Sequence, residues 1–417
     1  MSTTLRVVLL LLFASLLAWS ASGNVIYARL AYLWFFFIAF TWIWARLSLW
    51  RVSLTRQEMY KRAEVGRVFG EQIELHNKKR LPILWVEVQD QASMARGRGN
   101  RVLTMLAGRQ TQSYAYRSRL LQRGIYELGP TRLISGDPFG MFRVTKTFPA
   151  TDKLLVYPTL VEVARVPELP GLLPGGEALR RKTTQITPNA AGVREYAPGD
   201  PLSRIHWAST ARRERLMVKE FELDPKAEVW ILLDASLEAH VSAEMDAAEY
   251  ASLLWRNLSQ VEMLPATEEY AASAAASLAR YYLGRGRNVG LMSNREAVDV
   301  LPPDFGPRQL DKILQFLALW QARSGASLFS LVTTQVRYLP RGSTVILITS
   351  STGADVELCL DQFQRLGLRP MVVLLDAATF GAPPNGAAAL TARIQALRVP
   401  VRRVQRDDAL GQVLSTW

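Results

Sequence analysis

The residues with the clearest chemical potential follow a buried strand in the C-terminal half of the chain. The run Val229-Trp-Ile-Leu-Leu233 is continuously apolar, and Asp234-Ala-Ser236-Leu-Glu238 comes directly after it. In sheets built from alternating strands and helices, functional groups collect at the carboxyl ends of the strands. Carboxylate and hydroxyl oxygens are ligands of hard cations such as Mg²⁺. Asp234, Ser236 and Glu238 are therefore candidate metal ligands, and the alternative is that Asp234 only bonds nearby backbone amides.

Two further loops could contribute to the same edge. A second apolar strand, 344–349, is followed by Ser350 and Ser351, and Gly325-Ala-Ser327 offers another hydroxyl. Elsewhere the pattern argues against enzymatic chemistry. The three histidines are far apart and have no metal-ligand spacing, and there is no nucleophile elbow or phosphate-binding loop. The single cysteine, Cys359, lies in an apolar-periodic segment and is predicted to be a core residue. No catalytic residue and no cofactor beyond a cation are predicted.

These loops belong to a segment, 227–417, in which apolar strands alternate with amphipathic helices. Such alternation predicts a doubly wound α/β domain. We predict strands at 229–233, 288–292, 297–301, 344–349, 371–376 and 399–404, and helices at 244–258, 270–283, 308–320, 327–338, 356–366 and 387–397. Gly367 is the expected C′ residue of the fifth helix.

The N-terminal segment, 1–50, is predicted to be a transmembrane hairpin. The first apolar run, 7–19, is extended by small and apolar residues at 21–27, and a second run covers 30–49, so each approaches the ~20 residues needed to cross a bilayer. The short join is expected around Gly23-Asn24. The basic residues Arg46, Arg51, Arg56, Lys61 and Arg62 flank the second run. The positive-inside rule then places the bulk of the chain in the cytoplasm, anchored by two membrane crossings. The alternative is a cleaved signal peptide at the first run.

The next segment, 51–165, changes to strand-like alternation and is predicted to be a β-rich, sandwich-like domain. Residues 73–77 and 83–90 flank the basic turn Lys-Lys-Arg-Leu-Pro and are predicted to pair as a hairpin. Asp137-Pro-Phe-Gly140 is predicted to be a structural turn.

A connector, 166–226, leads into the α/β domain and contains the basic stretch 192–220. The net charge of the whole chain is +13, which favours an anionic neighbour. Such a stretch is compatible with three roles: nucleic-acid binding, contact with lipid headgroups, and structural pairing with interleaved acidic residues. No nucleic-acid motif is present, so no nucleic-acid partner is predicted. We favour the structural role, in which Arg204→Glu or Trp207→Ala would destabilise the protein.

This stretch resembles the bacterial "domain of unknown function 58" family. The residues that carry the resemblance are Arg194-Glu-Tyr-Ala-Pro-Gly-Asp200, Arg204-Ile-His-Trp207 and Ala211-Arg212, together with the strand that ends at Asp234. The upstream segments 123–130, 137–142 and 156–158 are also similar to that family, so the resemblance covers nearly the whole chain. The resulting motif residues, structural or interfacial, are Arg194, Tyr196, Pro198, Gly199, Asp200, Arg204, Trp207 and Arg212.

The resemblance implies a degenerate von Willebrand factor A-like domain. The metal pattern of A-type domains is Asp-x-Ser-x-Ser, which this chain matches at Asp234 and Ser236 and leaves at Glu238. It also implies a protein partner, because relatives are linked with MoxR-type AAA+ ATPases. The expected function is a non-enzymatic membrane scaffold or adaptor for envelope protein maturation or complex assembly. The alternative is a metal-dependent ligand-binding protein or enzyme that uses Asp234, Ser236 and Glu238. No oligomeric state is predicted.

Overall fold

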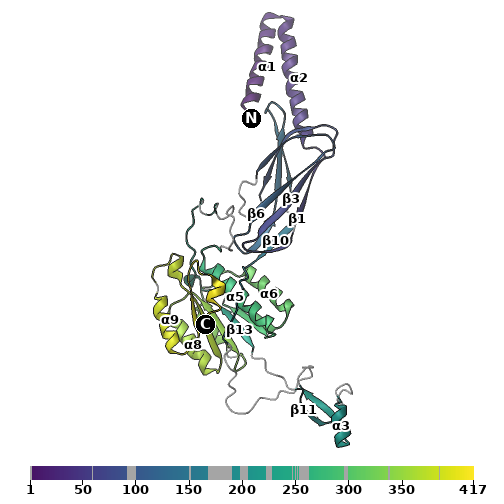
Figure 1. The fold of residues 1–417 in the computed structure, drawn as a ribbon. Helices are drawn as coiled ribbons and strands as arrows, with labels where there is room; N and C mark the ends of the chain where they lie inside the picture. The colour runs from purple at the N-terminus through teal and green to yellow at the C-terminus, as the bar shows by residue number, and fades with distance from the viewer. Residues whose placement is uncertain are drawn as a thin grey trace. The chain divides into compact units, whose positions relative to one another are not determined.

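The computed structural model divides into two compact units, which are described separately (Figure 1). The structure describes residues 2–417 except 59, 92–99, 150–151, 168–189, 198–204, 222–227, 247, 249, 251, 253–262, 295–298, 337–338 and 385. The first unit contains residues 1–159, and the second contains most of residues 160–417.

The first unit begins with two antiparallel helices, α1 (Thr3–Ser22) and α2 (Val25–Ser48). Gly23 has a φ of 67° and returns its N–H to Trp19 O at 2.8 Å, which ends α1. The Asn24 side chain then accepts a bond from Ile26 N at 3.0 Å and starts α2. A left-handed glycine followed by an N-cap residue is a compact way to reverse a helical chain. These two residues therefore make the predicted short join.

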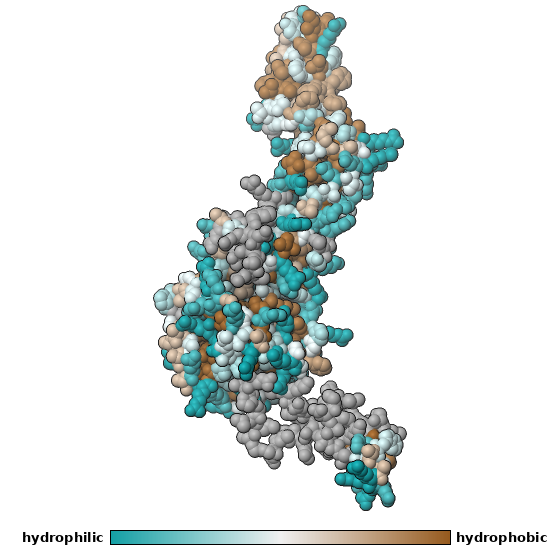
Figure 2. All heavy atoms as spheres, in the orientation of Figure 1, coloured by the Kyte–Doolittle hydropathy of each residue, from teal (hydrophilic) through white to brown (hydrophobic). Residues whose placement is uncertain are grey.

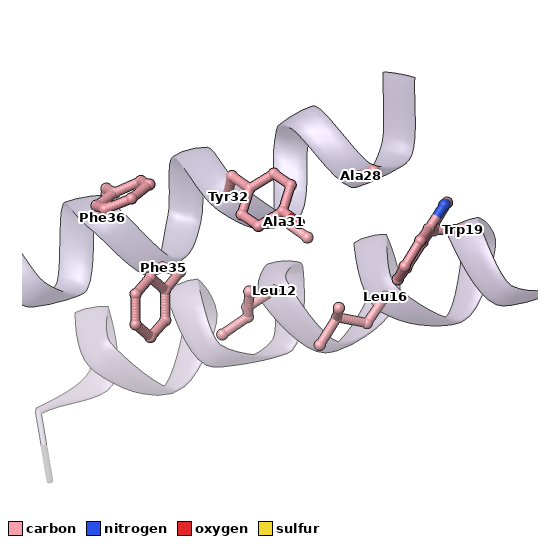
Figure 3. Close-up of a pocket in the computed structure, with 8 residues that line it drawn as sticks. All are labelled: Leu12, Leu16, Trp19, Ala28, Ala31, Tyr32, Phe35 and Phe36. Atoms are coloured by element: carbon pink, nitrogen blue, oxygen red, sulfur yellow. The ribbon is translucent and has the colours of Figure 1, made fainter. Parts of the chain in front are cut away.

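Both helices are long and apolar enough to cross a membrane. Their apolar side chains are largely exposed, and Figure 2 shows this end of the chain as predominantly hydrophobic. Between the helices lies an apolar groove of about 380 Å³, drawn in Figure 3. Leu12, Leu16 and Trp19 of α1 line it opposite residues 28–36 of α2. At the far end of α2, Arg46 lies over the Trp42 ring at 5.6 Å, and Arg51 lies over Trp50 at 4.6 Å. Aromatic and basic residues at helix ends are typical of a membrane interface.

The β-rich body follows, as the sequence predicts. Its strands are β1 (Val52–Glu58), β2 (Arg62–Glu64), β3 (Val68–Asn77), β4 (Ile83–Asp90), β5 (Arg101–Leu106), β6 (Thr111–Arg119), β7 (Gly124–Leu128), β8 (Thr131–Gly136), β9 (Arg143–Phe148) and β10 (Asp152–Tyr157). They form three sheets with the orders β1-β3-β6, β2-β10-β7 and β5-β4-β8-β9.

The predicted hairpin between residues 73–77 and 83–90 is wrong. β3 pairs with β1 and β6, whereas β4 pairs with β5 and β8. The basic turn crosses from one sheet to the other, and the Asn77 side chain fixes it by donating to Leu81 O and Ala107 O, both at 2.9 Å. Side chains of β3 and β4 then meet in one core, which contains Ile73, Val86 and Val88. An alternating pattern gives the face of each strand, but it does not name the partner strand.

A buried ion cluster also joins these two sheets. Arg56 of β1 lies 3.4 Å from Glu71 of β3 and 3.1 Å from Asp90 of β4, and it donates to Thr131 Oγ1 of β8 at 2.8 Å. The charged side chains are at most 5% exposed. Arg56 is therefore an interior residue of the body, although the sequence placed it among the charges that flank the membrane.

Asp137 makes the predicted turn between β8 and β9. Its carboxylate accepts bonds from the backbone amides of Phe139, Met141 and Phe142, at distances of 2.5 to 3.2 Å. Phe139, at the tip, lies edge-to-face against Phe37 of α2 with ring centroids 4.9 Å apart. The structural role predicted for Asp137 is confirmed, and the turn also contacts the helical hairpin.

Lys79 ties the other side of the body to α2. Its ammonium group donates to Leu47 O and to Ser48 O, the latter at 2.6 Å, in the last turn of the helix. Carbonyls in the last turn of a helix lack the usual partner one turn on, although Leu47 O also accepts from Trp50 N at 3.3 Å, and the negative end of the helix dipole favours a cation there. Lys79 is 6% exposed, and burial lowers its pKa from 10.5 to about 8.

This pKa gives a testable pH dependence. Between pH 8 and 10.5 the folded chain has released the Lys79 proton while the unfolded chain still holds it, so the free energy of unfolding should rise with pH. We expect a rise of about 1 kcal/mol or more that is lost in Lys79→Met. The measurement is denaturant unfolding in detergent at pH 8 to 10.5. Lys78→Met, at the exposed neighbour, is the control and should keep the full rise.

The second unit contains a mixed, six-stranded sheet in the order β15-β14-β13-β16-β17-β18. Its strands are β13 (Val229–Leu233), β14 (Val289–Ser293), β15 (Asp299–Asp304), β16 (Thr344–Thr349), β17 (Arg369–Leu375) and β18 (Val401–Val404). Its helices are η2 (Leu237–Ala239), α5 (Thr267–Gly284), α6 (Pro307–Leu319), α7 (Leu328–Gln335), α8 (Ala354–Arg365), η4 (Ala377–Phe380), α9 (Ala387–Ala396) and α10 (Leu410–Val413).

Five of these strands are parallel, and β15 runs antiparallel to β14 at the edge. Prolines 302 and 303 suit this edge position, because proline cannot donate to a ladder. Gly290 of β14 lies under the Trp230 ring, where an added Cβ would meet ring carbons at 2.7 Å. The predicted helix at 244–258 lies mostly outside the described residues. Gly367 has a φ of 72° directly after the C-cap of α8, which confirms its predicted role.

Helices cover the two faces of the sheet unequally. Residues of α7, α8 and α9 form one apolar cluster with the sheet, and Cys359 of α8 is fully buried in it, as predicted. Burial raises the pKa of the Cys359 thiol to about 12, with smaller contributions from Asp355 and Asp234. The other face is covered by α5, an alanine-rich helix that is buried along most of its length. Segment 160–166 crosses α5, where Ser277 Oγ accepts from Val161 N at 3.0 Å and Tyr281 Oη accepts from Val166 N at 2.9 Å.

Candidate functional site

Asp234 lies where β13 ends, and its buried carboxylate joins two loops at the carboxyl edge of the sheet. Oδ1 accepts bonds from Ser236 Oγ at 2.5 Å and from Ser236 N at 3.0 Å. Oδ2 accepts from Thr349 Oγ1 at 2.7 Å, at the end of β16. Asp234 is 1% exposed. Three donors from the protein therefore satisfy the carboxylate, and hydrogen bonds to a charged acceptor are among the stronger ones.

Asn294, which follows β14, organises the same edge. Its Oδ1 accepts from Ala235 N at 2.6 Å, and its amide nitrogen donates to Ala326 O at 3.0 Å and to Ser236 Oγ at 3.3 Å. Ser324 completes the frame: its N–H donates to Ala235 O at 2.8 Å, and its carbonyl accepts from Leu237 N at 3.0 Å. Loops after β13, β14, β16 and α6 thus converge on Asp234 and Ser236.

His240 supports the loop from behind. Its Nε2 lies 2.7 Å from Asp234 O, so Nε2 carries a proton and donates to that carbonyl. Its ring stands edge-on to Trp320, with centroids 5.6 Å apart, and Trp320 Nε1 donates to Ser293 Oγ at 2.8 Å. The histidine is therefore used to position the main chain at Asp234.

In the described part of the chain, the other predicted ligands make no hydrogen bond to Asp234 or Ser236. Glu238 lies in η2 and is exposed. Ser350 Oγ is turned to Ala239 O, Ser351 Oγ accepts from Gly353 N at 3.3 Å, and Ser327 caps α7. Among the described residues, no group of three or more His, Cys, Asp and Glu side chains is placed to hold a metal ion. Metal binding at Asp234, Ser236 and Glu238 stays a prediction, and the observed bonds are those of a structural link.

Sequence reasoning did not identify Thr349 as a partner of Asp234, or Asn294 as the residue that bonds Ala235 and Ser236. Both follow, or end, a continuous apolar strand, so their position at the carboxyl edge could have been found from the strand ends alone. Their closeness to Asp234 depends on the strand order, in which β13 lies between β14 and β16. Adjacent loops of a parallel sheet meet at the point where the order reverses along the chain.

The basic motif forms a separate small element. β11 (Ala190–Glu195) pairs antiparallel with β12 (Met217–Phe221), and α3 (Trp207–Arg213) lies between them in sequence. Ile205, Met217 and Val218 are buried, and His206 N–H donates to Met217 O at 2.8 Å.

The helix of this element begins at a histidine cap. The His206 ring accepts from Ser209 N at 3.2 Å, and Ser209 Oγ lies 2.7 Å from the same ring nitrogen, Nδ1. Thr210 Oγ1 accepts from Met217 N at 3.0 Å, which ties the helix to β12. The side chains of His206 and Thr210 therefore fix the local fold of the motif by accepting bonds from backbone amides.

The charged and aromatic motif residues are turned outward from this support. Trp207 is 68% exposed, and Arg212 and Arg213 are exposed in the last turn of α3. Arg215 pairs with Glu195 at 2.9 Å, and both side chains are more than half exposed. Such a surface pair contributes little to stability. Trp207 is therefore not buried within this small element, and the structural role predicted for it stays a prediction.

Several motif residues lie outside what the structure describes. Pro198, Gly199, Asp200 and Arg204 are among them, as is the side chain of Arg194, whose backbone pairs with Val218. Tyr196 donates its N–H to Leu216 O at 2.8 Å, which continues the ladder beyond β11.

Comparison with solved structures gives only weak similarities. The CARDB domain of the PF1109 protein from Pyrococcus furiosus has a TM-score of 0.20 at 9% identity, and it covers 25% of this chain and 91% of its own. An exo β-N-acetylglucosaminidase of Vibrio harveyi has a TM-score of 0.18 at 8% identity, over 86% of this chain and 60% of its own. These values carry no argument about function.

Comparison with protein sequences is more informative. The chain is 23% identical over 324 residues to the Uncharacterized protein YeaD of Bacillus subtilis (strain 168), which spans 75% of this chain and 74% of that protein. Residues 192–408 match the family model "Protein of unknown function DUF58". That match begins within β11, contains the basic motif and Asp234, and extends past β18. Because it spans more than half of the chain, the protein belongs to the DUF58 family.

Proposed function

We propose that this protein is a membrane-anchored adaptor that binds a protein partner through its C-terminal half. The observation that carries the proposal is the exposed Trp207 on a helix that buried residues hold in place. Tryptophan and arginine are enriched among residues that dominate protein interfaces. Trp207 with Arg212 and Arg213 therefore forms the proposed contact surface, named here the Trp207 face.

The proposed anchor is the α1–α2 hairpin. The N-terminus of α1, the C-terminus of α2 and the bulk of the chain then lie on the cytoplasmic side of a bacterial inner membrane. The support is the length and composition of the two helices and the basic residues Arg46 and Arg51 after α2. A mostly parallel sheet with helices on both faces is compatible with a von Willebrand A-like domain in the second unit. An AAA+ ATPase of the MoxR type is the partner class that the family resemblance suggests, and envelope protein maturation or complex assembly is the proposed setting.

The Trp207→Ala variant tests the contact surface. Because most of Trp207 is exposed, we expect the free energy of unfolding to change by less than about 0.5 kcal/mol. Loss of an interface tryptophan should weaken partner binding by tenfold or more. The measurement is recovery of a defined ATPase from solubilised membranes, with and without nucleotide, by tagged full-length protein.

Phe305→Ala is the matched control, since Phe305 is also 68% exposed but lies after β15. It should leave recovery unchanged. A Trp207→Ala protein that unfolds early would restore the structural role of this residue. Equal recovery by wild type and Trp207→Ala would remove the Trp207 face from the proposal.

A further inference from the structure

The β18 strand ends the six-stranded sheet and leaves one edge without a described neighbouring strand. Val372 N donates to Pro400 O at 2.9 Å, and Asp376 N donates to Val404 O at 2.8 Å. Since backbone groups of alternate residues point the same way along a strand, residues 400, 402 and 404 face β17. The N–H and C=O groups of Val401 and Arg403 therefore point away from the sheet.

A groove of about 490 Å³ follows this edge. Thr391 and Gln395 of α9 line one side, Val413 and Thr416 line the other, and Arg402 and Arg403 of β18 lie between them. The lining residues belong to the second unit, and all of them are described. A strand added here would run between two helical walls, with the main chain of β18 as the floor.

The charge of the groove is positive and incompletely neutralised. Arg402 Nη1 donates to Val401 O at 3.1 Å, and its guanidinium lies 5.8 Å from the centre of the Trp417 ring. Arg402 Nε is buried and has no hydrogen-bond partner among the described residues. Burial lowers the pKa of Arg402, which reflects the cost of holding this cation out of water. Arg403 Nε lies 3.9 Å from Asp376 Oδ2, a long contact that leaves its other donors available.

We propose that the β18 groove binds an extended acidic peptide segment of a partner protein, which adds a strand to the sheet. The outward Arg403 N–H would donate to the peptide main chain, and a peptide carboxylate would pair with the Arg402 guanidinium. Strand addition uses main-chain bonds for affinity and side-chain contacts for selectivity. The four residues of β18 limit the added strand to about four residues, a length of about 13 Å.

This inference goes beyond the adaptor function, because it assigns a second surface that shares no residue with the Trp207 face. It holds whether or not the partner is an ATPase. Failure at β18 would leave the Trp207 result unchanged, so the two proposals can be separated.

The test uses full-length protein in detergent and a fluorescein-labelled peptide of alternating Val and Glu residues, with binding followed by fluorescence anisotropy. Arg402→Glu should weaken binding by about tenfold or more, since it reverses a charge that contacts the ligand. Arg403→Ala keeps the outward N–H and should therefore reduce peptide affinity less than Arg402→Glu does. Arg403→Pro removes that N–H without touching the ladder to β17, so it should bind at least about tenfold more weakly than Arg403→Ala.

Two controls separate strand addition from general attraction to a basic chain. Arg365→Glu, at an exposed arginine of α8 paired with Asp361, should bind like wild type. A peptide of the same charge with alternate Val residues replaced by Pro should bind at least about tenfold more weakly, because it cannot form the ladder. Thermal unfolding of each variant confirms that the sheet is intact.

Four results would overturn the proposal. The first is the absence of saturable binding, and the second is equal affinity of the wild-type protein for the Val–Glu and the Pro-containing peptides. The third is equal peptide affinity of Arg403→Pro and Arg403→Ala, and the fourth is a loss of affinity in Arg365→Glu as large as that in Arg402→Glu. Binding of a single-stranded oligonucleotide in place of the acidic peptide, with loss in Arg402→Glu, would assign the groove to nucleic acid instead.

Discussion

Asp234→Ala should destabilise the second unit by about 3 kcal/mol, because three donors at the carboxyl edge of the sheet lose their acceptor. Ser236 follows β13 and Thr349 ends β16, and the carboxylate is the group that joins them. Leaving buried donors unsatisfied costs more than the net value of the bonds themselves. Loop opening should follow, with faster amide exchange at the ends of β13 and β16.

Asp234→Asn separates the structural link from the metal hypothesis. An asparagine keeps one acceptor oxygen and the volume, and the hydroxyl of Thr349 can rotate to accept from the new amide. The cost should therefore be about 1 kcal/mol. Denaturant unfolding of the full chain, read with hydrogen exchange to locate the change, measures both variants. Glu238→Ala, at an exposed side chain, is the control and should change the free energy by less than about 0.5 kcal/mol.

The metal hypothesis makes a different prediction for the same proteins. If Asp234 holds a cation, calorimetric titration with Mg²⁺, Ca²⁺ or Mn²⁺ should give a signal that Asp234→Asn and Glu238→Ala both reduce. If the carboxylate is only a structural link, wild type should give no heat of binding. A clear metal signal with unchanged stability in Asp234→Ala would reverse our interpretation of this edge.

Arg56→Met should destabilise the β-rich body by about 4 kcal/mol, since it leaves the carboxylates of Glu71 and Asp90 buried without that cation. All three side chains are at most 5% exposed, and Arg56 also donates to Thr131. The methionine keeps most of the volume, so the loss reports charge rather than a cavity.

The companion variant Arg67→Met tests whether the loss of stability depends on the burial of the arginine that is replaced. Arg67 pairs with Glu64 at 3.5 Å, but its side chain is 72% exposed. The Arg67→Met variant should therefore lower the free energy of unfolding by less than about 0.5 kcal/mol. Urea unfolding with amide exchange of β1 and β3 as the readout distinguishes this body from the second unit. Similar losses in both variants would show that the buried cluster has no special role.

The two sites show what a sequence pattern can and cannot supply. The buried strands of the second unit were predicted because each is a short, continuous run of apolar residues between helices. Asp234 was found for the same reason, since it directly follows such a run. Its bond to Thr349 was not predicted, and neither were the bonds of Asn294 to Ala235 and Ser236, because both depend on the order of neighbouring strands, which periodicity does not encode.

The β-rich body shows the same limit in another form. Alternation correctly identified residues 73–77 and 83–90 as strands, but the connection crosses between sheets instead of forming a hairpin. The sequence grouped Arg56 with the basic residues that flank the second membrane helix. Its side chain points into the interior of the body because of its position on β1, which that grouping did not take into account. Trp207 was expected to be structural from its setting among charges, and its exposure depends on which face of α3 it occupies.

The burial of Cys359 makes this chain convenient for site-directed labelling. A thiol with a pKa near 12 at a fully buried position stays protonated at neutral pH, and a protonated thiol reacts slowly with maleimides. A cysteine introduced at Thr391 beside β18, or at Phe305, could then carry a fluorophore or spin label while the native residue remains in place. The native cysteine therefore does not have to be replaced before distances are measured between labels in a lipid bilayer.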